Sequence, residues 1–239
     1  MIRPIALACL LLGGSMVFGQ EVIAHWDFSK GKIDSLDGKF KMRCRGNTRI
    51  AGPEGKQYLD VGITSKDKPE GIIALKKYPE LTPKGAFRLE IKARLREQTS
   101  RNNHMVLWDN NYILNPRGTY KNNANAKKGL IVYLIRSQDG KMRPQTAFGF
   151  GESLDAFSGK PVELEEEQDF TLALEYDGVK KVSFFLNGKL NRAAEVKTGG
   201  PLAEAVYPLV IGDRFGSSYN RFDGQILEVK LTALPSPEK

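Results

Sequence analysis

The chain has 239 residues, 41% of them hydrophobic, which suffices for one sizeable core, so we expect a single domain after any leader. Its 36 Lys and Arg outnumber its 28 Asp and Glu, for a formal charge of +8. Two histidines and two cysteines exclude a His/Cys transition-metal cluster. The chain also lacks a phosphate-binding glycine loop and a G-x-S-x-G elbow.

Residues 1–19 have the layout of a secretory signal peptide: Arg3, an apolar run, then small residues up to Gly19. We expect cleavage there, a mature domain at 20–239, and a secreted or periplasmic location. A lipoprotein cysteine at Cys9 is the less favoured alternative. Cys44 is the other cysteine, so no intrachain disulfide is expected. No later segment reads as a membrane span.

Loss of Arg3 with the leader reduces the charge to 35 minus 28, or +7. For an exported protein this excess favours an extracellular or cell-envelope polysaccharide, in particular an anionic one, over nucleic acid. Solubility alone would account for the excess equally well.

The mature chain begins with short predicted strands. In 22–28, Trp26 and Phe28 share one parity and point inward, whereas His25 points outward. In 40–44, alternation with Phe40 and Met42 places Cys44 on the buried face.

A long strand is predicted over 87–96, where apolar residues alternate with four cations and Glu90. This basic face most simply keeps the sheet soluble, and the alternative is a polyanion site. A non-periodic stretch at 115–129 predicts a functional or mobile loop. The run 129–137 is apolar on both parities, which is typical of a central strand covered on both faces.

The clearest pattern lies between Asp169 and Leu190. Phe170, Leu172, Leu174 and Tyr176 alternate with polar residues, Asp177-Gly178 turns the chain, and a second strand ends in Asn187-Gly188, the signature of a type I′ hairpin. The whole chain gives roughly twelve strands and no convincing long helix, which predicts an antiparallel two-sheet β-sandwich.

The order of these segments resembles the laminin-G-like jelly rolls of the concanavalin A-like lectin and glucanase superfamily. The residues that carry the resemblance are an early W-x-F (Trp26, Phe28) with a Gly/Asp-rich loop, FRLEIKARLR, the YDG and NGK turns, PLVIGD and FDGQILEVKL. The resemblance implies a jelly roll over most of the mature chain. It does not fix the function, because the superfamily includes lectins, adhesion modules, glycosidases and lyases.

Many relatives carry an aspartate in the penultimate strand that helps bind calcium, whereas this chain has Leu227 at that position. Leucine supplies no oxygen ligand, and calcium needs six to eight. We therefore expect no cofactor. Calcium remains an alternative through Asp34, Asp37 or Asp213.

Catalytic alternatives within this fold are a glycoside hydrolase and a polysaccharide lyase. A retaining hydrolase needs two carboxylates about 5 Å apart, and the nearest acidic run, Glu163–Glu167, reads as solvated surface. Glu90 and Glu175 are a further pair to test. A lyase would need a Tyr, His and Arg or Gln set, for which His104, Tyr133 and Arg136 are available. Without a recognisable motif for either, we expect no enzyme activity.

The remaining hypothesis is a lectin-like sugar-binding surface built from aromatic rings with neighbouring Asn, Asp and Arg groups. Trp108 is equally compatible with the core. The competing hypothesis is an adhesion module that binds protein, for which Phe185 would be exposed. The candidate sugar-binding residues are Trp108, Asn110, Tyr112, Arg117, Tyr120, Arg136, Arg214, Tyr219 and Arg221.

Overall fold

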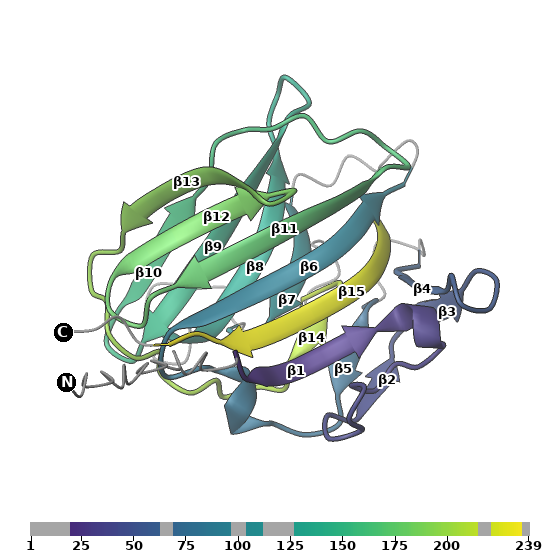
Figure 1. Cartoon of the computed structure of the whole chain (residues 1–239), viewed down its shortest axis with the longest axis horizontal. Helices are drawn as coiled ribbons and strands as arrows, with labels where there is room; N and C mark the ends of the chain where they lie inside the picture. Colours follow the sequence, from purple (N-terminus) through teal and green to yellow (C-terminus); the bar gives the residue numbers. More distant parts are fainter. Residues whose placement is uncertain (1–19, 63–68, 97–103, 112–126, 215–220, 236–239) are drawn as a thin grey trace, which may run out of the picture.

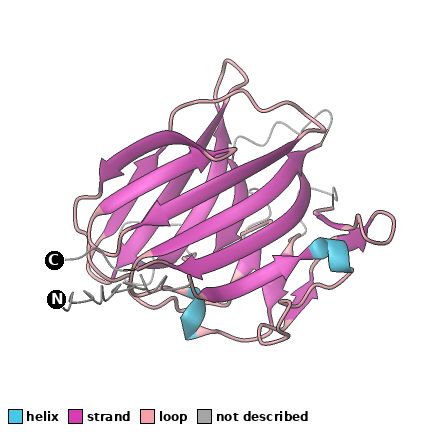
Figure 2. Cartoon of the chain, in the orientation of Figure 1, coloured by secondary structure: helices cyan, strands magenta, loops and turns pink. Residues whose placement is uncertain are grey.

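A computed structural model describes residues 20–62, 69–96, 104–111, 127–214 and 221–235. In this part of the chain two antiparallel sheets pack face to face, and two short 3-10 turns, η1 (Phe28–Lys30) and η2 (Pro79–Leu81), are the only helical elements (Figure 2). The predicted antiparallel two-sheet β-sandwich of jelly-roll type is confirmed. The predicted leader, 1–19, lies outside the described residues.

The front sheet in Figure 1 has eight strands in the order β13-β12-β11-β6-β15-β4-β3, and β1 also pairs with β15. Its long strands alternate between inward apolar and outward polar side chains. The strands are β1 (Val22–Asp27), β3 (Arg49–Ala51), β4 (Tyr58–Asp60), β6 (Phe87–Leu95), β11 (Asp169–Tyr176), β12 (Lys181–Leu186), β13 (Lys189–Glu195) and β15 (Gly224–Ala233).

The second sheet lies behind it and has seven strands in the order β10-β9-β8-β7-β14-β5-β2. The expected central strand is β8, which pairs with β7 and β9 and buries residues on both faces. The strands are β2 (Met42–Cys44), β5 (Ile72–Ala74), β7 (His104–Asp109), β8 (Lys128–Arg136), β9 (Met142–Phe150), β10 (Leu154–Ser158) and β14 (Val210–Ile211).

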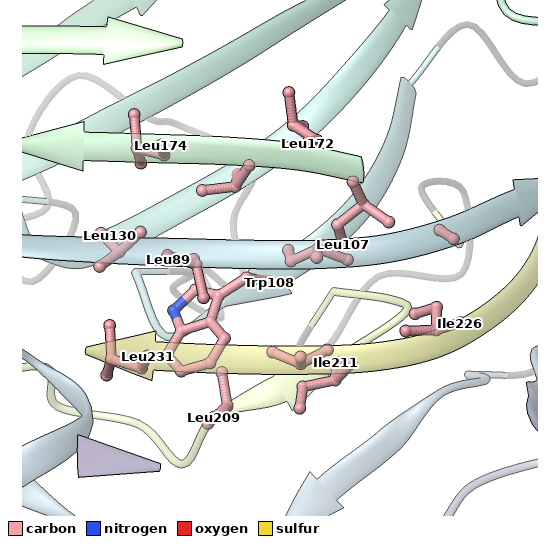
Figure 3. Close-up of a cluster of buried hydrophobic side chains, with 14 of the residues drawn as sticks. Leu89, Leu107, Trp108, Leu130, Leu172, Leu174, Leu209, Ile211, Ile226 and Leu231 are labelled. Atoms are coloured by element: carbon pink, nitrogen blue, oxygen red, sulfur yellow. The ribbon is translucent and has the colours of Figure 1, made fainter. Parts of the chain in front are cut away.

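The main hydrophobic core fills the space between the two sheets. The Trp108 ring lies there among Leu89, Leu209 and Leu231 (Figure 3), and it meets Trp26 edge to face with the ring centroids 6.2 Å apart. As predicted, Trp26 and Phe28 are fully buried. His25 is half-buried on the other side of β1, where its Nε2 lies 2.6 Å from Glu228 Oε1.

The hairpin predicted over Asp169–Leu190 forms β11, β12 and the start of β13. Asn187 and Gly188 have φ of 49° and 76°, the left-handed values that a type I′ turn requires. The Asp177 carboxylate stabilises the preceding turn by accepting hydrogen bonds from the backbone N–H groups of Val179, Lys180 and Lys181.

The prediction for Cys44 is wrong, because its side chain is exposed although Phe40 and Met42 are buried. Cys44 ends β2, a three-residue strand at the edge of the seven-stranded sheet, and the chain leaves the sheet there. Alternation therefore no longer decides which way the side chain points. No helix in the described residues is long and apolar enough to cross a membrane.

Candidate functional site

The outer face of the seven-stranded sheet carries a second, small apolar cluster, opposite in parity to the residues that enter the main core. Val106, Ile131 and Ala147 are buried in this cluster, and Tyr133 packs against it. Their strands β7, β8 and β9 are neighbours, so the cluster forms a floor across the middle of the sheet.

Polar and aromatic side chains extend from this floor. Tyr133 lies opposite Val106 on one side and Gln145 on the other, and its hydroxyl donates a hydrogen bond of 2.8 Å to Gln145 Oε1. His104, two residues before Val106, stacks on the Tyr133 ring with centroids 6.0 Å apart and planes 28° from parallel. The three side chains are exposed or half-buried and lie on the outer face of the neighbouring strands β7, β8 and β9. We call His104, Tyr133 and Gln145 the β7–β9 strip.

Both rings of the β7–β9 strip are neutral near pH 7. Burial lowers the pKa of His104, and the positive charge of Arg214 lowers this pKa further. Burial raises the pKa of Tyr133, against the smaller, opposite effect of Arg214. The strip therefore offers neutral hydrogen-bonding groups and ring faces, which is the combination that binds sugar hydroxyls and pyranose faces.

Arginines flank the strip. Arg143 is half-buried on the same face of β9 as Gln145, and its Nε has no hydrogen-bond partner in the described part of the chain. Arg214 follows β14, and its Nε lies 3.5 Å from Asp109 Oδ2. Arg214 is close enough to influence both rings electrostatically.

A buried carboxylate supports the segment that carries Arg214. Asp213 Oδ2 accepts a 2.8 Å hydrogen bond from the backbone N–H of Glu70 and lies 3.5 Å from Arg45 Nη2. Burial raises the pKa of Asp213 to about 6, although Arg45 and Arg221 act in the opposite direction. The charges of Arg45 and Arg221 therefore interact with the buried Asp213 carboxyl inside the fold.

Two of the predicted sugar-binding residues are corrected by the structure. Trp108 is fully buried in the core and presents no ring face to a ligand. Asn110 is buried too: its Nδ2 donates to the Leu81 carbonyl at 2.8 Å, and its Oδ1 accepts from the backbone N–H of Leu130 at 2.8 Å. Both residues stabilise the sandwich.

The structure also separates the predicted arginines. Arg214 joins the site, whereas Arg221 is only 6% exposed and its backbone bridges to Val106. Arg136 ends β8 with the opposite parity to Tyr133, so it does not share the outward row of the strip. The remaining candidates, Tyr112, Arg117, Tyr120 and Tyr219, lie outside the described residues.

Gln145 and Arg143 are site residues that no motif in the sequence singles out. Their signal in the sequence is the alternation of Arg143, Gln145 and Ala147 in β9, which places two polar side chains in one row beside Tyr133. His104 and Tyr133 were considered only as part of a lyase set with Arg136, and the structure brings those two into contact.

The carboxylate pair considered for hydrolysis is held by an arginine. Arg88 Nη2 lies 2.7 Å from Glu90 Oε2 and Arg88 Nη1 lies 2.6 Å from Glu175 Oε1, so the two carboxylates share one guanidinium on the outer face of the eight-stranded sheet. Both carboxylates are therefore engaged in ion pairs. In the acidic run Glu163–Glu167, the Glu163 side chain is 82% exposed.

Phe185, the residue singled out for the adhesion hypothesis, is half-buried beneath Arg88. The guanidinium carbon of Arg88 lies 5.3 Å from the centroid of the Phe185 ring.

The cations that follow Arg88 in β6 and directly after it are paired as well. Lys92 and Arg94 share the carboxylate of Asp169, and Arg96 binds Asp60. The row therefore does not present free charge to a polyanion. In the described ranges, no group of three or more His, Cys, Asp or Glu side chains could hold a metal ion.

No protein-family model matches the chain, and no curated protein matches its sequence. Among solved structures, domain 4 of AbnA, an extracellular GH43 arabinanase from Geobacillus stearothermophilus, in complex with arabinotriose, is 13% identical with a TM-score of 0.58. The match covers 90% of this chain and 93% of that chain.

Botulinum neurotoxins provide further structural neighbours. The type C toxin, whose cell entry depends on interaction with two ganglioside molecules, is 11% identical with a TM-score of 0.62 over 88% of this chain. The binding domain of toxin DC in complex with rat synaptotagmin II is 13% identical, with a TM-score of 0.61 over 88% of this chain. The chain spans about half the length of these toxin chains, 47% and 48%. At these identities the likeness shows the fold, a two-sheet β-sandwich.

Proposed function

We propose that this domain is a non-catalytic, lectin-like carbohydrate-binding module and that its ligand lies across the β7–β9 strip. The observation that carries the proposal is the stack of His104 on Tyr133, with the Tyr133 hydroxyl held by Gln145. A pyranose can pack on such rings while its hydroxyls bond to their polar edges. The fold it shares with an arabinanase domain bound to arabinotriose and with a ganglioside-dependent toxin supports this use.

The proposed ligand is an anionic polysaccharide of the extracellular space or cell envelope. Arg143 and Arg214 flank the strip, and a guanidinium group matches the geometry of sulfate and carboxylate with two parallel hydrogen bonds. The signal-like leader and the excess of basic residues favour the same class of ligand. The laminin-G-like assignment belongs to this proposal and rests on the sequence resemblance.

We expect Arg143→Ala and Tyr133→Ala each to weaken binding to sulfated or uronate glycans by about tenfold, because one removes a guanidinium and the other a ring face. A glycan array at two ionic strengths identifies the ligand, and calorimetry measures affinity. Binding should weaken at high salt, since exposed charges are screened over about 10 Å at 0.1 M. Arg49→Ala is the control, because this arginine is 72% exposed on an edge strand of the other sheet.

Two results would count against this proposal. Salt-insensitive binding that requires Tyr133 would keep a sugar site on the strip but remove the anionic ligand. Wild-type protein that binds no glycan on the array would instead favour the adhesion module.

A second candidate function, β-elimination of a uronate, is favoured by the contact between His104 and Tyr133. Neutral His104 would remove the proton beside the carboxylate, the electron pair would form a carbon–carbon double bond, and the glycosidic oxygen would leave with a proton from the Tyr133 hydroxyl. Arg214 or Arg143 would neutralise the carboxylate.

Incubation with alginate, polygalacturonate and heparin separates the two candidates, because elimination produces a conjugated acid that absorbs ultraviolet light. A non-catalytic module leaves the absorbance unchanged. A rise that disappears in His104→Ala but persists in Arg49→Ala would identify the domain as a lyase.

A further inference from the structure

A polar pocket of about 520 Å³ opens on the outer face of the eight-stranded sheet, on the opposite side of the sandwich from the β7–β9 strip. The β3–β4 hairpin contributes Gln57 and Tyr58, η1 contributes Ser29, and β6 contributes Arg94. Its volume lies within the range of roughly 300–1,000 Å³ that is usual for small-ligand sites.

The apolar part of the pocket comes from a break in the pattern of β15. The register between β15 and β6 shifts between Ile226 and Glu228, so Leu227 is an extra residue in a β-bulge. Ile226 and Val229 stay in the core, whereas Leu227 and Glu228 are half-buried and line the pocket. The bulge thus brings an aliphatic side chain to the outer face of the eight-stranded sheet.

Tyr58 supplies an aromatic ring to the same pocket. The position of this ring depends on Gly52, because a Cβ built there would lie 3.0 Å from Tyr58 Cε1 and 3.2 Å from Cδ1. Gly52 also has a φ of 93°, which side chains rarely adopt. The absence of a side chain at Gly52 therefore leaves room for the edge of the Tyr58 ring.

The polar wall is rigid because its groups hold one another. Asp169 Oδ1 accepts hydrogen bonds from Arg94 Nε at 2.9 Å and Nη2 at 2.6 Å, and its Oδ2 lies 3.2 Å from Lys92 Nζ. On the other side, Ser29 donates from its hydroxyl to Asp27 at 2.6 Å. Side chains fixed in this way can bind hydroxyl groups at little further cost in conformational entropy.

The charges of the pocket balance. Three cations (Lys56, Lys92 and Arg94) face three carboxylates (Asp27, Asp169 and Glu228), so the formal sum is zero. An anion would gain no net attraction here, and it would compete with Asp169 for Arg94 and Lys92. A neutral molecule with several hydroxyl groups and an apolar face matches both the polar wall and the floor formed by Tyr58 and Leu227.

We infer that this pocket is a second carbohydrate site, selective for a neutral glycan, and that the domain can hold two different saccharides on its two opposite faces. The inference rests on the pocket alone and does not require the β7–β9 strip to bind sugar.

Affinity electrophoresis in gels that contain β-glucan, galactomannan or arabinan tests the inference at 0.5 M salt, where charge-driven binding is suppressed. The wild-type protein should be retarded in at least one gel. Tyr58→Ala and Gln57→Ala should each weaken that binding by about tenfold. Gln138→Ala is the matched control for Gln57→Ala, since it removes an exposed amide side chain from the turn between β8 and β9, outside both proposed sites, and its retardation should equal that of the wild type.

Thermal denaturation of each variant shows whether it is folded, and Gln57→Ala keeps the test valid if loss of the Tyr58 ring unfolds the hairpin. Three results would overturn the inference: no retardation in any of the three gels, unchanged retardation of both pocket variants, or loss of neutral binding in Tyr133→Ala. The last result would place the neutral glycan on the β7–β9 strip, so failure of this inference is distinct from failure of the proposed function.

Discussion

Replacement of Trp108 by alanine is expected to lower the free energy of unfolding by about 3–5 kcal/mol, as is usual when a large aromatic side chain is removed from a core. The indole ring is fully buried between the sheets (Figure 3) and meets Trp26 edge to face. Its removal loses this contact and leaves a cavity that the two sheets cannot close without bending. Equilibrium denaturation in urea measures the change.

Leu75→Ala is the control for Trp108→Ala, because Leu75 is 59% exposed and its truncation should change stability by less than about 0.5 kcal/mol. One result would contradict the position of Trp108 in the core: a Trp108→Ala protein that keeps wild-type stability but no longer binds glycan. That result would show that Trp108 belongs to the binding surface.

Asn110→Ala is expected to cost about 2–4 kcal/mol. The Asn110 side chain donates to the carbonyl of Leu81 and accepts from the N–H of Leu130, so it ties the η2 turn to β8. Alanine would leave both backbone groups buried without a partner, and each unpaired group costs about 1–3 kcal/mol. Thermal denaturation, with glycan affinity measured on the folded fraction, separates this structural effect from any role in binding.

The matched control for Asn110→Ala is Gln138→Ala, which removes an exposed amide side chain from the turn between β8 and β9. Its melting temperature should equal that of the wild type. An Asn110→Ala protein as stable as this control would show that other groups satisfy the Leu81 carbonyl and the Leu130 N–H.

The sequence predicts the strands well where one face of a strand is buried and the other face is exposed to solvent. The period-2 patterns of β6 and β11 place their apolar residues inward as expected, and Asn187-Gly188 predicts the turn between β12 and β13. In these segments local pattern and tertiary packing require the same geometry.

In other strands, β-bulges make it impossible to predict from alternation alone which face of the sheet a side chain occupies. Met105 and Leu107 point into the core, so strict alternation would place Trp108 beside Val106 on the outer face. The register between β7 and β8 shifts between Val106 and Trp108, and this bulge turns Trp108 inward. Alternation within β7 cannot reveal this shift, because the shift depends on how β7 pairs with β8.

The β7–β9 strip could be predicted only in part, since its members come from three strands. The alternation within each strand indicates which side chains face outward, but the register between strands decides that Tyr133 lies opposite Gln145 and within reach of His104. The buried support through Asp213 and Glu70 joins residues 143 positions apart, and no local pattern connects them.

The position of β15 determines the order in which the molecule can assemble. Although β15 is the last strand described, it lies inside the eight-stranded sheet, between β6 on one side and β1 and β4 on the other (Figure 1). While the ribosome still holds 224–233, β1 and β4 have no bridge to β6. The emerging chain is therefore expected to keep this sheet open until residues 224–233 have been released, and such distant pairing makes folding slow. An open chain of this kind remains accessible to chaperones.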